Sequence, residues 1–205
     1  MAVRQRATPV EALLLACLLA VLLSPTPASA ASARVLAAPA SAIVVNFNVP
    51  VDAGSADYVQ HAAQLAIDDR ADLILVMNTP GGLLANMIQI VGSIQTVQDA
   101  GLAVYTYVPP VALAASAGSY IALATNATYM GSGSIIGPST PYIVGGDPSE
   151  VQHVQNAMIA YISSLAQKNG YNVTAAANMA QNNAAYPASE AAAIGLVSGM
   201  AETFE

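Results

Sequence analysis

The sequence predicts an α/β fold: one domain in which a parallel sheet is built from strands joined by helices in right-handed crossovers. Short runs rich in Leu, Ile and Val alternate with longer amphipathic stretches along most of the chain, and this alternation is typical of parallel sheets. The short runs are apolar nearly throughout, as expected for strands covered on both faces. The 205-residue chain, even without an N-terminal leader, is long enough for one domain with a sizeable core.

The first thirty residues are predicted to be a secretory signal peptide. Arg4 and Arg6 give a basic start, residues 13–23 form an apolar core, and an A-x-A cleavage pattern ends at Ala30. The apolar core is short for a membrane span, so we favour cleavage and export over an uncleaved leader that anchors the protein to the membrane. Cys17, the one cysteine, lies in this leader, which excludes a disulfide framework and thiol catalysis in the mature chain.

An Ala/Ser/Pro-rich linker at residues 31–41 precedes the domain, which we expect at residues 42–205. Apolar runs predict five strands, at residues 42–49, 72–78, 103–108, 127–130 and 134–136. Apolar periodicity predicts five helices between and after them, at residues 55–69, 83–100, 115–125, 149–169 and 174–183. A Pro/Gly-rich loop is expected at residues 137–148.

The first two predicted helices are supported by an apolar face and by a signal at one end. In the first helix Ser55 is the expected N-cap, and the expected buried face contains Tyr58, Ala62, Leu65 and Ala66. The second helix is expected to stop at Gly101 and to bury Met87, Ile90, Val91, Ile94 and Val97.

Composition excludes several classes of function. The formal net charge is −7 with only five Lys and Arg residues, so no basic patch exists to bind nucleic acid. Two histidines and no clustered carboxylates predict no metal site. The Gly-Gly pair ending at Gly82 is not followed by Gly-Lys-Ser/Thr, so no phosphate loop and no cofactor are expected.

Two stretches of small residues have the residue types of an acyl-transfer site. A Thr-Pro-Gly-Gly motif ends at Gly82, directly after a predicted strand, and its glycines let a substrate carbonyl approach the backbone closely. Ser116 lies in Ala-Ala-Ser-Ala-Gly, at the positive end of a predicted helix. Either motif alone is also typical of a tight turn or of close helix packing. Together they predict Ser116 as nucleophile and the N–H groups of Gly81, Gly82 and Ala117 as an oxyanion hole.

These motifs resemble the ClpP-class serine proteases, in particular the NfeD-type and signal peptide peptidase A branches. The resemblance extends over residues 42–200 and includes the stretches at residues 159–167 and 186–197. It implies the ClpP/crotonase fold and peptide hydrolysis through an acyl-enzyme. It further implies substrates that are apolar segments near a membrane, such as the tails of stomatin-type partners, and a homodimer or larger assembly.

The general base is where the chain departs from this family. The two branches use a Ser–Lys dyad, and the position that aligns with the lysine is His153. The only lysine, Lys168, lies at the far end of the same predicted helix, and the ClpP-branch histidine position near Gly137 holds no base. His153 could act as the base, oriented by Glu150 one turn earlier.

Two other interpretations stay open. His153 could be a surface residue of a pseudoprotease that binds membrane-protein partners without cleaving them. The least favoured interpretation is an enzyme of the crotonase branch that acts on acyl-CoA. The chain has few cations, and cations would be needed to bind the anionic CoA tail. The sequence does not decide between activity and inactivity, nor does it give the substrate sequence, the size of the assembly or whether the chain is part of a longer protein.

Overall fold

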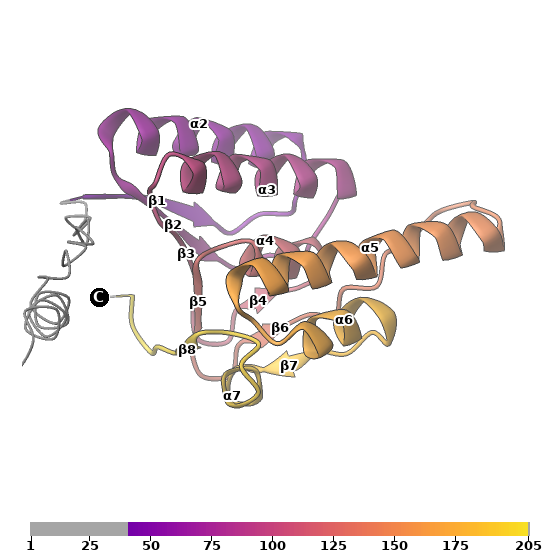
Figure 1. The fold of residues 1–205 in the computed structure, drawn as a ribbon. Helices are drawn as coiled ribbons and strands as arrows, with labels where there is room; N and C mark the ends of the chain where they lie inside the picture. Colours follow the sequence, from indigo (N-terminus) through magenta and orange to yellow (C-terminus); the bar gives the residue numbers. More distant parts are fainter. Residues whose placement is uncertain (1–40, 205) are drawn as a thin grey trace, which may run out of the picture. The chain divides into compact units, whose positions relative to one another are not determined.

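Five parallel strands form the main sheet, in the order β1-β2-β3-β5-β8 (Figure 1). The strands are β1 (Ala42–Phe47), β2 (Asp72–Met77), β3 (Val104–Val108), β5 (Ala127–Met130) and β8 (Gly199–Met200). The computed structural model describes residues 41–204, so the predicted signal peptide and all but the last residue of the predicted linker lie outside the described residues. The parallel pairing of every neighbour in this sheet confirms the predicted α/β class.

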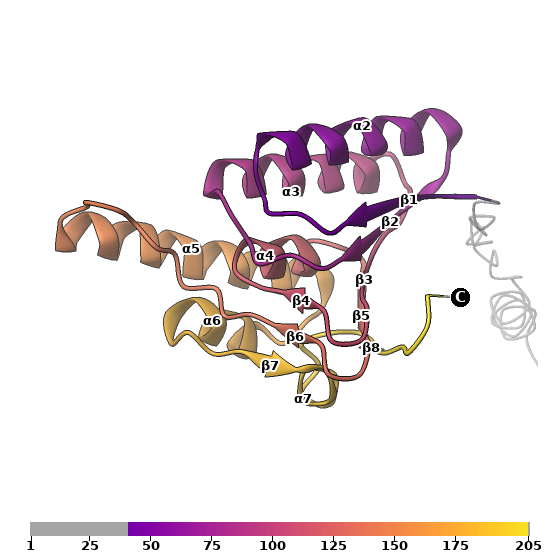
Figure 2. The ribbon, with the colours of Figure 1, turned by 180° about the vertical axis from the view of Figure 1, so that it is seen from behind.

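One face of the sheet is covered by helices α2 (Ala53–Asp69), α3 (Leu84–Asp99) and α4 (Ala117–Leu123), as Figures 1 and 2 show. Side chains on this face, such as Phe47 and Leu75, are fully buried. On the opposite face, Val44 and Tyr129 are 42% and 41% exposed. The expectation that both faces are covered is therefore wrong for the described residues, where only the C-terminal tail reaches the second face.

A second sheet has three strands, in the order β4-β6-β7. It contains β4 (Leu113–Ala114), β6 (Ile135–Ile136) and β7 (Tyr186–Pro187), with β4 and β6 parallel and β7 antiparallel to β6. A single bridge between Thr79 and Ala114 joins it to the loop after β2. The sequence predicted β6 but neither β4 nor β7.

The C-terminal half is helical and packs against α4. It contains α5 (Pro148–Asn169), α6 (Val173–Gln181) and α7 (Ala188–Ala193). Helix α5 begins with a capping box between Asp147 and Glu150 and ends at Gly170 in the left-handed conformation. Its first buried residue is Met158, and its start extends away from the other elements together with the loop before it (Figures 1 and 2).

The predicted buried face was right for α3 and half right for α2, where Ala62 and Ala66 are buried as expected but Tyr58 and Leu65 are not. In α3 the five residues expected to be buried are the five that are buried. In α2 the N-cap is Asp52, whose carboxylate accepts from the Ser55 N–H at 2.8 Å, so Ser55 is the third residue of the capping box and not the cap. Tyr58 and Leu65 are exposed, because α2 packs against the sheet through a stripe of alanines that permits a close approach.

Candidate active site

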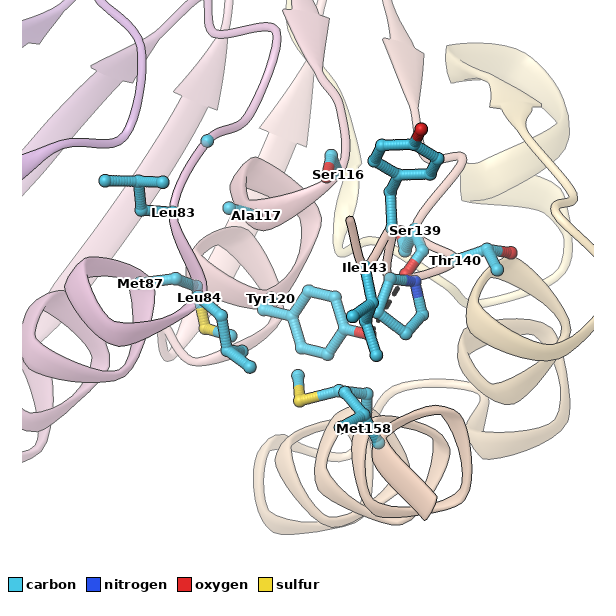
Figure 3. A pocket seen from close by; sticks show the side chains of 14 residues that line it. Leu83, Leu84, Met87, Ser116, Ala117, Tyr120, Ser139, Thr140, Ile143 and Met158 are labelled. Atoms are coloured by element: carbon cyan, nitrogen blue, oxygen red, sulfur yellow. Dashed lines mark hydrogen bonds between the residues drawn. The ribbon is translucent and has the colours of Figure 1, made fainter. Parts of the chain in front are cut away.

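Ser116 lies at a sharp turn between β4 and α4, at the N-cap position of the helix. Its backbone has φ 51° and ψ −120°, a conformation that costs a non-glycine residue on the order of 1–3 kcal/mol. The Ser116 N–H donates to the carbonyl of Pro138 at 2.7 Å, which holds the turn in place. Its hydroxyl forms no hydrogen bond within the described part of the chain and opens onto a pocket (Figure 3).

Gly81 and Gly82 bring the backbone of the β2–α3 loop close to this turn. Both have positive φ, 97° and 158°. A Cβ on Gly81 would lie 2.4 Å from the Cβ of Ser116, and one on Gly82 would lie 2.1 Å from the carbonyl oxygen of Val51. No side chain fits at either position, so the loop requires glycine at both.

The three N–H groups expected in the oxyanion hole are not equivalent. The Gly81 N–H donates to the Thr79 hydroxyl at 3.2 Å, whereas those of Gly82 and Ala117 have no acceptor among residues 41–204. Gly82, Ser116 and Ala117 line the same pocket. Two N–H donors without an acceptor in the described part of the chain therefore lie beside Ser116, and Gly81 allows the close approach of the loop.

The pocket has a volume of about 440 Å³ and is mainly apolar, which is within the range of ligand-binding sites. Its walls come from α3, α4, the loop after β6 and α5 (Figure 3), and its apolar side chains include Leu84, Met87, Ile143 and Met158. Thr140 also lines the pocket, and its hydroxyl is buried without a hydrogen-bond partner among the described residues. Buried polar groups are normally paired, so an extended peptide could supply the missing partner.

A buried hydrogen-bond network fixes α4 to the loop behind Ser116. The Ser119 hydroxyl donates to the Ser116 carbonyl at 2.7 Å and shares a 2.5 Å hydrogen bond with the Ser139 hydroxyl. The Tyr120 hydroxyl donates to the Ser139 carbonyl at 3.1 Å. Burial raises the pKa of Tyr120 above its usual value, so this donor stays protonated at neutral pH.

The candidate base is not brought to the pocket. His153 is exposed on α5 and forms no hydrogen bond within the described chain, and the pocket is lined by its neighbour Val154 instead. The Glu150 carboxylate, expected to orient His153, accepts from the Asp147 N–H in the capping box. Lys168 lies in the last turn of α5 and donates to Gln98 at 3.2 Å.

Two residues of the site were missed by sequence reasoning. Thr79 is fully buried, and its hydroxyl both donates to the Val49 carbonyl at 2.7 Å and accepts from Gly81, which fixes the glycine turn. Its place directly before Pro-Gly-Gly is a signal that could have found it. Ser139 lies in the Pro/Gly-rich loop, where nothing in the local sequence marks it as buried.

Residues 41–204 contain neither a metal-binding cluster nor a membrane-spanning helix. No group of three or more His, Cys, Asp or Glu side chains there could hold a metal ion. No helix in that part of the chain has the length and apolar character needed to cross a bilayer.

Comparison with known proteins gives one family match and several relatives. The model of the NfeD1b N-terminal domain family matches residues 41–203. A membrane-bound protease of Pyrococcus horikoshii is 37% identical over 139 residues, which are 65% of this chain and 31% of that protein. The membrane protein NfeD1b of Bacillus subtilis is 35% identical over 121 residues, 58% of this chain and 26% of that protein. The chain thus spans less than a third of these relatives.

Solved structures of the 1510-N stomatin-specific membrane protease from Pyrococcus horikoshii are similar to this chain at 31% identity. A serine-to-alanine variant has a TM-score of 0.71 and covers 80% of this chain and 81% of its own. A lysine-to-alanine variant in complex with a substrate peptide has a TM-score of 0.72, with coverages of 82% and 78%. The ClpP catalytic domain of Plasmodium falciparum, at 16% identity and a TM-score of 0.62 over 80% and 87%, shows the fold alone.

Proposed function

Because this chain belongs to the NfeD1b N-terminal domain family, we propose that it is a serine peptidase that cleaves apolar peptide segments at or near a membrane. Family membership confirms the predicted resemblance to ClpP-class proteases and the predicted fold. The observation that carries the activity is local. The Ser116 hydroxyl and the N–H groups of Gly82 and Ala117 lie together at an apolar pocket, and none of the three has a hydrogen-bond partner among residues 41–204.

The proposed reaction is acyl transfer. The Ser116 oxygen attacks the carbonyl carbon of the peptide bond while its proton passes to a general base, and the oxyanion accepts hydrogen bonds from Gly82 and Ala117. The carbon–nitrogen bond then breaks, the amine leaves with a proton returned by the base, and a water molecule hydrolyses the acyl-enzyme. The base is proposed to be His153, at the position that aligns with the family lysine.

The proposed substrate follows from the pocket and the relatives. Apolar walls from Leu84, Met87 and Met158 favour an apolar side chain. A solved relative is named as specific for stomatin and was captured with a substrate peptide, so we propose a stomatin-type partner for this chain. Its curated relatives are membrane proteins, which supports a location at or near a membrane; the predicted signal peptide is the reason to place it outside the cytoplasm.

One observation favours a second candidate function. None of the fourteen residues that line the pocket is His, Lys, Asp or Glu. A pseudoprotease would keep the fold and the apolar pocket, bind the same segments and release them uncleaved.

The test combines a fluorophosphonate probe with cleavage of an apolar peptide. We expect the parent protein to be labelled and active and Ser116→Ala to be neither, whereas Ser164→Ala, which removes an exposed hydroxyl on α5, should behave as the parent. His153→Ala should lose activity, and His153→Lys should keep it. Labelling that persists in Ser116→Ala would exclude Ser116 as the nucleophile. A parent protein that binds the peptide but is never labelled would establish the pseudoprotease.

A further inference from the structure

Helices α2, α3 and α4 cover one face of the main sheet (Figures 1 and 2), and three tyrosines lie on the other face. Tyr105 and Tyr107 are two positions apart on β3, so their side chains point to the same face. Tyr129 on β5 is the register partner of Tyr107, and Ile74 on β2 is that of Tyr105. These residues line a second cavity, which shares no lining residue with the pocket at Ser116. The proposed peptidase reaction therefore does not use them.

The cavity between the three tyrosines, here called the tyrosine pocket, has a volume of about 140 Å³. Ile74 and two residues that follow β8, Ala201 and Phe204, also line it. The rings of Phe204 and Tyr107 pack together, with centroids 5.9 Å apart. Sites for small-molecule ligands usually enclose about 300–1,000 Å³. The tyrosine pocket is much smaller, so it fits a single side chain of a larger partner.

Two carboxylates give the tyrosine pocket a negative charge. Burial raises the pKa of Tyr105, and the charge of Asp72 adds to the rise. Burial also raises the pKa of Tyr107, with a further contribution from the charge of Glu202. The hydrogen-bond donors to these carboxylates are neutral: the N–H of Ala103, and the N–H and hydroxyl of Ser132. The lining of the pocket contains no Lys, Arg or His, so no cation there balances the two charges.

We propose that the tyrosine pocket binds a cationic side chain, that of arginine or lysine, on a partner protein. The face of an aromatic ring is negative and attracts a cation that lies over it. The planar guanidinium group of arginine also stacks on such rings. Asp72 and Glu202 add full negative charges, so the pocket and a cationic side chain are complementary in charge. The formal net charge of the whole chain, −7, attracts a basic partner over a longer distance.

Two other occupants suit the tyrosine pocket less well. An apolar side chain would fill the space between the rings but would leave Asp72 and Glu202 without a counter-charge. The choline headgroup of a lipid is a cation, but it is joined to a phosphate group, and the two carboxylates would repel that phosphate. A basic segment of a protein satisfies the rings and the carboxylates together.

Two short peptides that differ by one charge test this proposal. One is a capped pentapeptide with arginine among Gly and Ala residues, and the other has citrulline, a neutral isostere of arginine, at the same position. Both are titrated into the Ser116→Ala protein, so that no cleavage can occur, while the amide NMR signals of β3 and β5 are followed. We expect the arginine peptide to shift these signals saturably and the citrulline peptide to bind about tenfold more weakly. Higher ionic strength should weaken binding of the arginine peptide.

Three variants locate the binding site. Tyr129→Leu removes a ring at a position that is 41% exposed and should weaken binding of the arginine peptide about tenfold. Glu202→Gln removes a charge but keeps an acceptor for Ser132, and it should weaken binding about threefold. Tyr58→Leu is the matched control, because Tyr58 is an exposed tyrosine on α2 outside the pocket, and its affinity should be unchanged. Circular dichroism checks that each variant folds.

The opposite results would overturn the proposal. Equal affinity for the citrulline peptide, or higher affinity for a norleucine peptide, would establish an apolar site. Unchanged binding in Tyr129→Leu, or an arginine peptide that shifts no signal of β3 or β5, would exclude the tyrosine pocket. Phosphatidylcholine vesicles that bind only while Tyr129 is present, without binding of the arginine peptide, would establish a site for lipid headgroups. None of these measurements depends on cleavage, so the outcome leaves the proposed peptidase function untouched.

Discussion

Replacing Gly81 by alanine would place a methyl group against Ser116, the proposed nucleophile. The added Cβ would lie 2.4 Å from the Cβ of Ser116 and 2.9 Å from the carbonyl oxygen of Ala115. Carbon atoms in contact are normally about 3.5–4.0 Å apart. One of the two backbones must therefore move by about 1 Å, and the turn that holds Ser116 is fixed by the Pro138 carbonyl and by the network at Ser119.

The expected loss of stability has two sources. Overpacking a filled site costs roughly 1–3 kcal/mol. A side chain at positive φ adds about 1–2 kcal/mol, because Gly81 has φ 97°. Together they predict a loss of about 2–5 kcal/mol in the free energy of unfolding, measured by urea denaturation. Displacing the hydroxyl by about 1 Å should also slow fluorophosphonate labelling of Ser116 by about 100-fold.

Gly195→Ala is the matched control. Gly195 has φ 71°, and a Cβ there would meet no atom within 4 Å. This variant should show the backbone cost alone, about 1–2 kcal/mol, with labelling at the parental rate. If Gly81→Ala lost no more stability than Gly195→Ala and reacted as fast as the parent, the close approach between the glycine loop and Ser116 would be refuted.

Three further perturbations test other parts of the site. Ser119→Ala should cost about 1–3 kcal/mol in urea denaturation, because it leaves buried partners of the network unpaired; an unchanged midpoint would contradict that network. Met158→Ala and Ile162→Ala should each cost about 2–5 kcal/mol as core truncations, but only Met158→Ala should raise the KM for an apolar peptide, since only Met158 lines the pocket. Hydrogen bonds from the Ser149 hydroxyl and from the N–H groups of Glu150 and Ser149 lower the pKa of Asp147 below its usual value. Its folded-state pKa is thus below the unfolded one, so the cap stabilises α5 above the unfolded pKa of about 3.9 and loses this effect as pH falls through the lower folded value. The hydrogen-exchange protection factors at the start of α5, which correct for the intrinsic pH dependence of exchange, should fall in that acid range in the parent and not in Asp147→Asn. An equal fall in both would exclude the cap as the cause.

The turn at Ser116 could be predicted because its constraints are local. Gly81 and Gly82 are needed where no Cβ fits, and Ser116 is the one hydroxyl at the turn between a short strand and a helix. Steric restrictions of this kind limit which residue types fit at neighbouring positions, so they are visible as a sequence motif. The buried side of α3 was predicted for a similar reason, since its large apolar residues repeat with the helical period.

Features that depend on distant parts of the chain were missed. Strand β4 has two residues and pairs with β6 more than twenty positions later, so no local periodicity marks it. The buried face of α2 consists mainly of alanines, which are also common on protein surfaces. The larger apolar side chains of Tyr58 and Leu65 were therefore wrongly predicted to be buried. The direction of His153 depends on which side of α5 packs, and the residues that decide it, such as Met158, lie after it in the chain.

The lack of buried residues in residues 141–157, the segment that contains the start of α5 and the loop before it, sets a thermal limit on any function that uses this segment. Segments without buried side chains open at a free-energy cost well below that of global unfolding. Residues 141–157 are such a segment, whereas the sheet and α3 are anchored by fully buried apolar side chains. On heating, this segment would detach while the sheet is still intact, so a function that depends on it would be lost at temperatures where the protein still appears folded by circular dichroism.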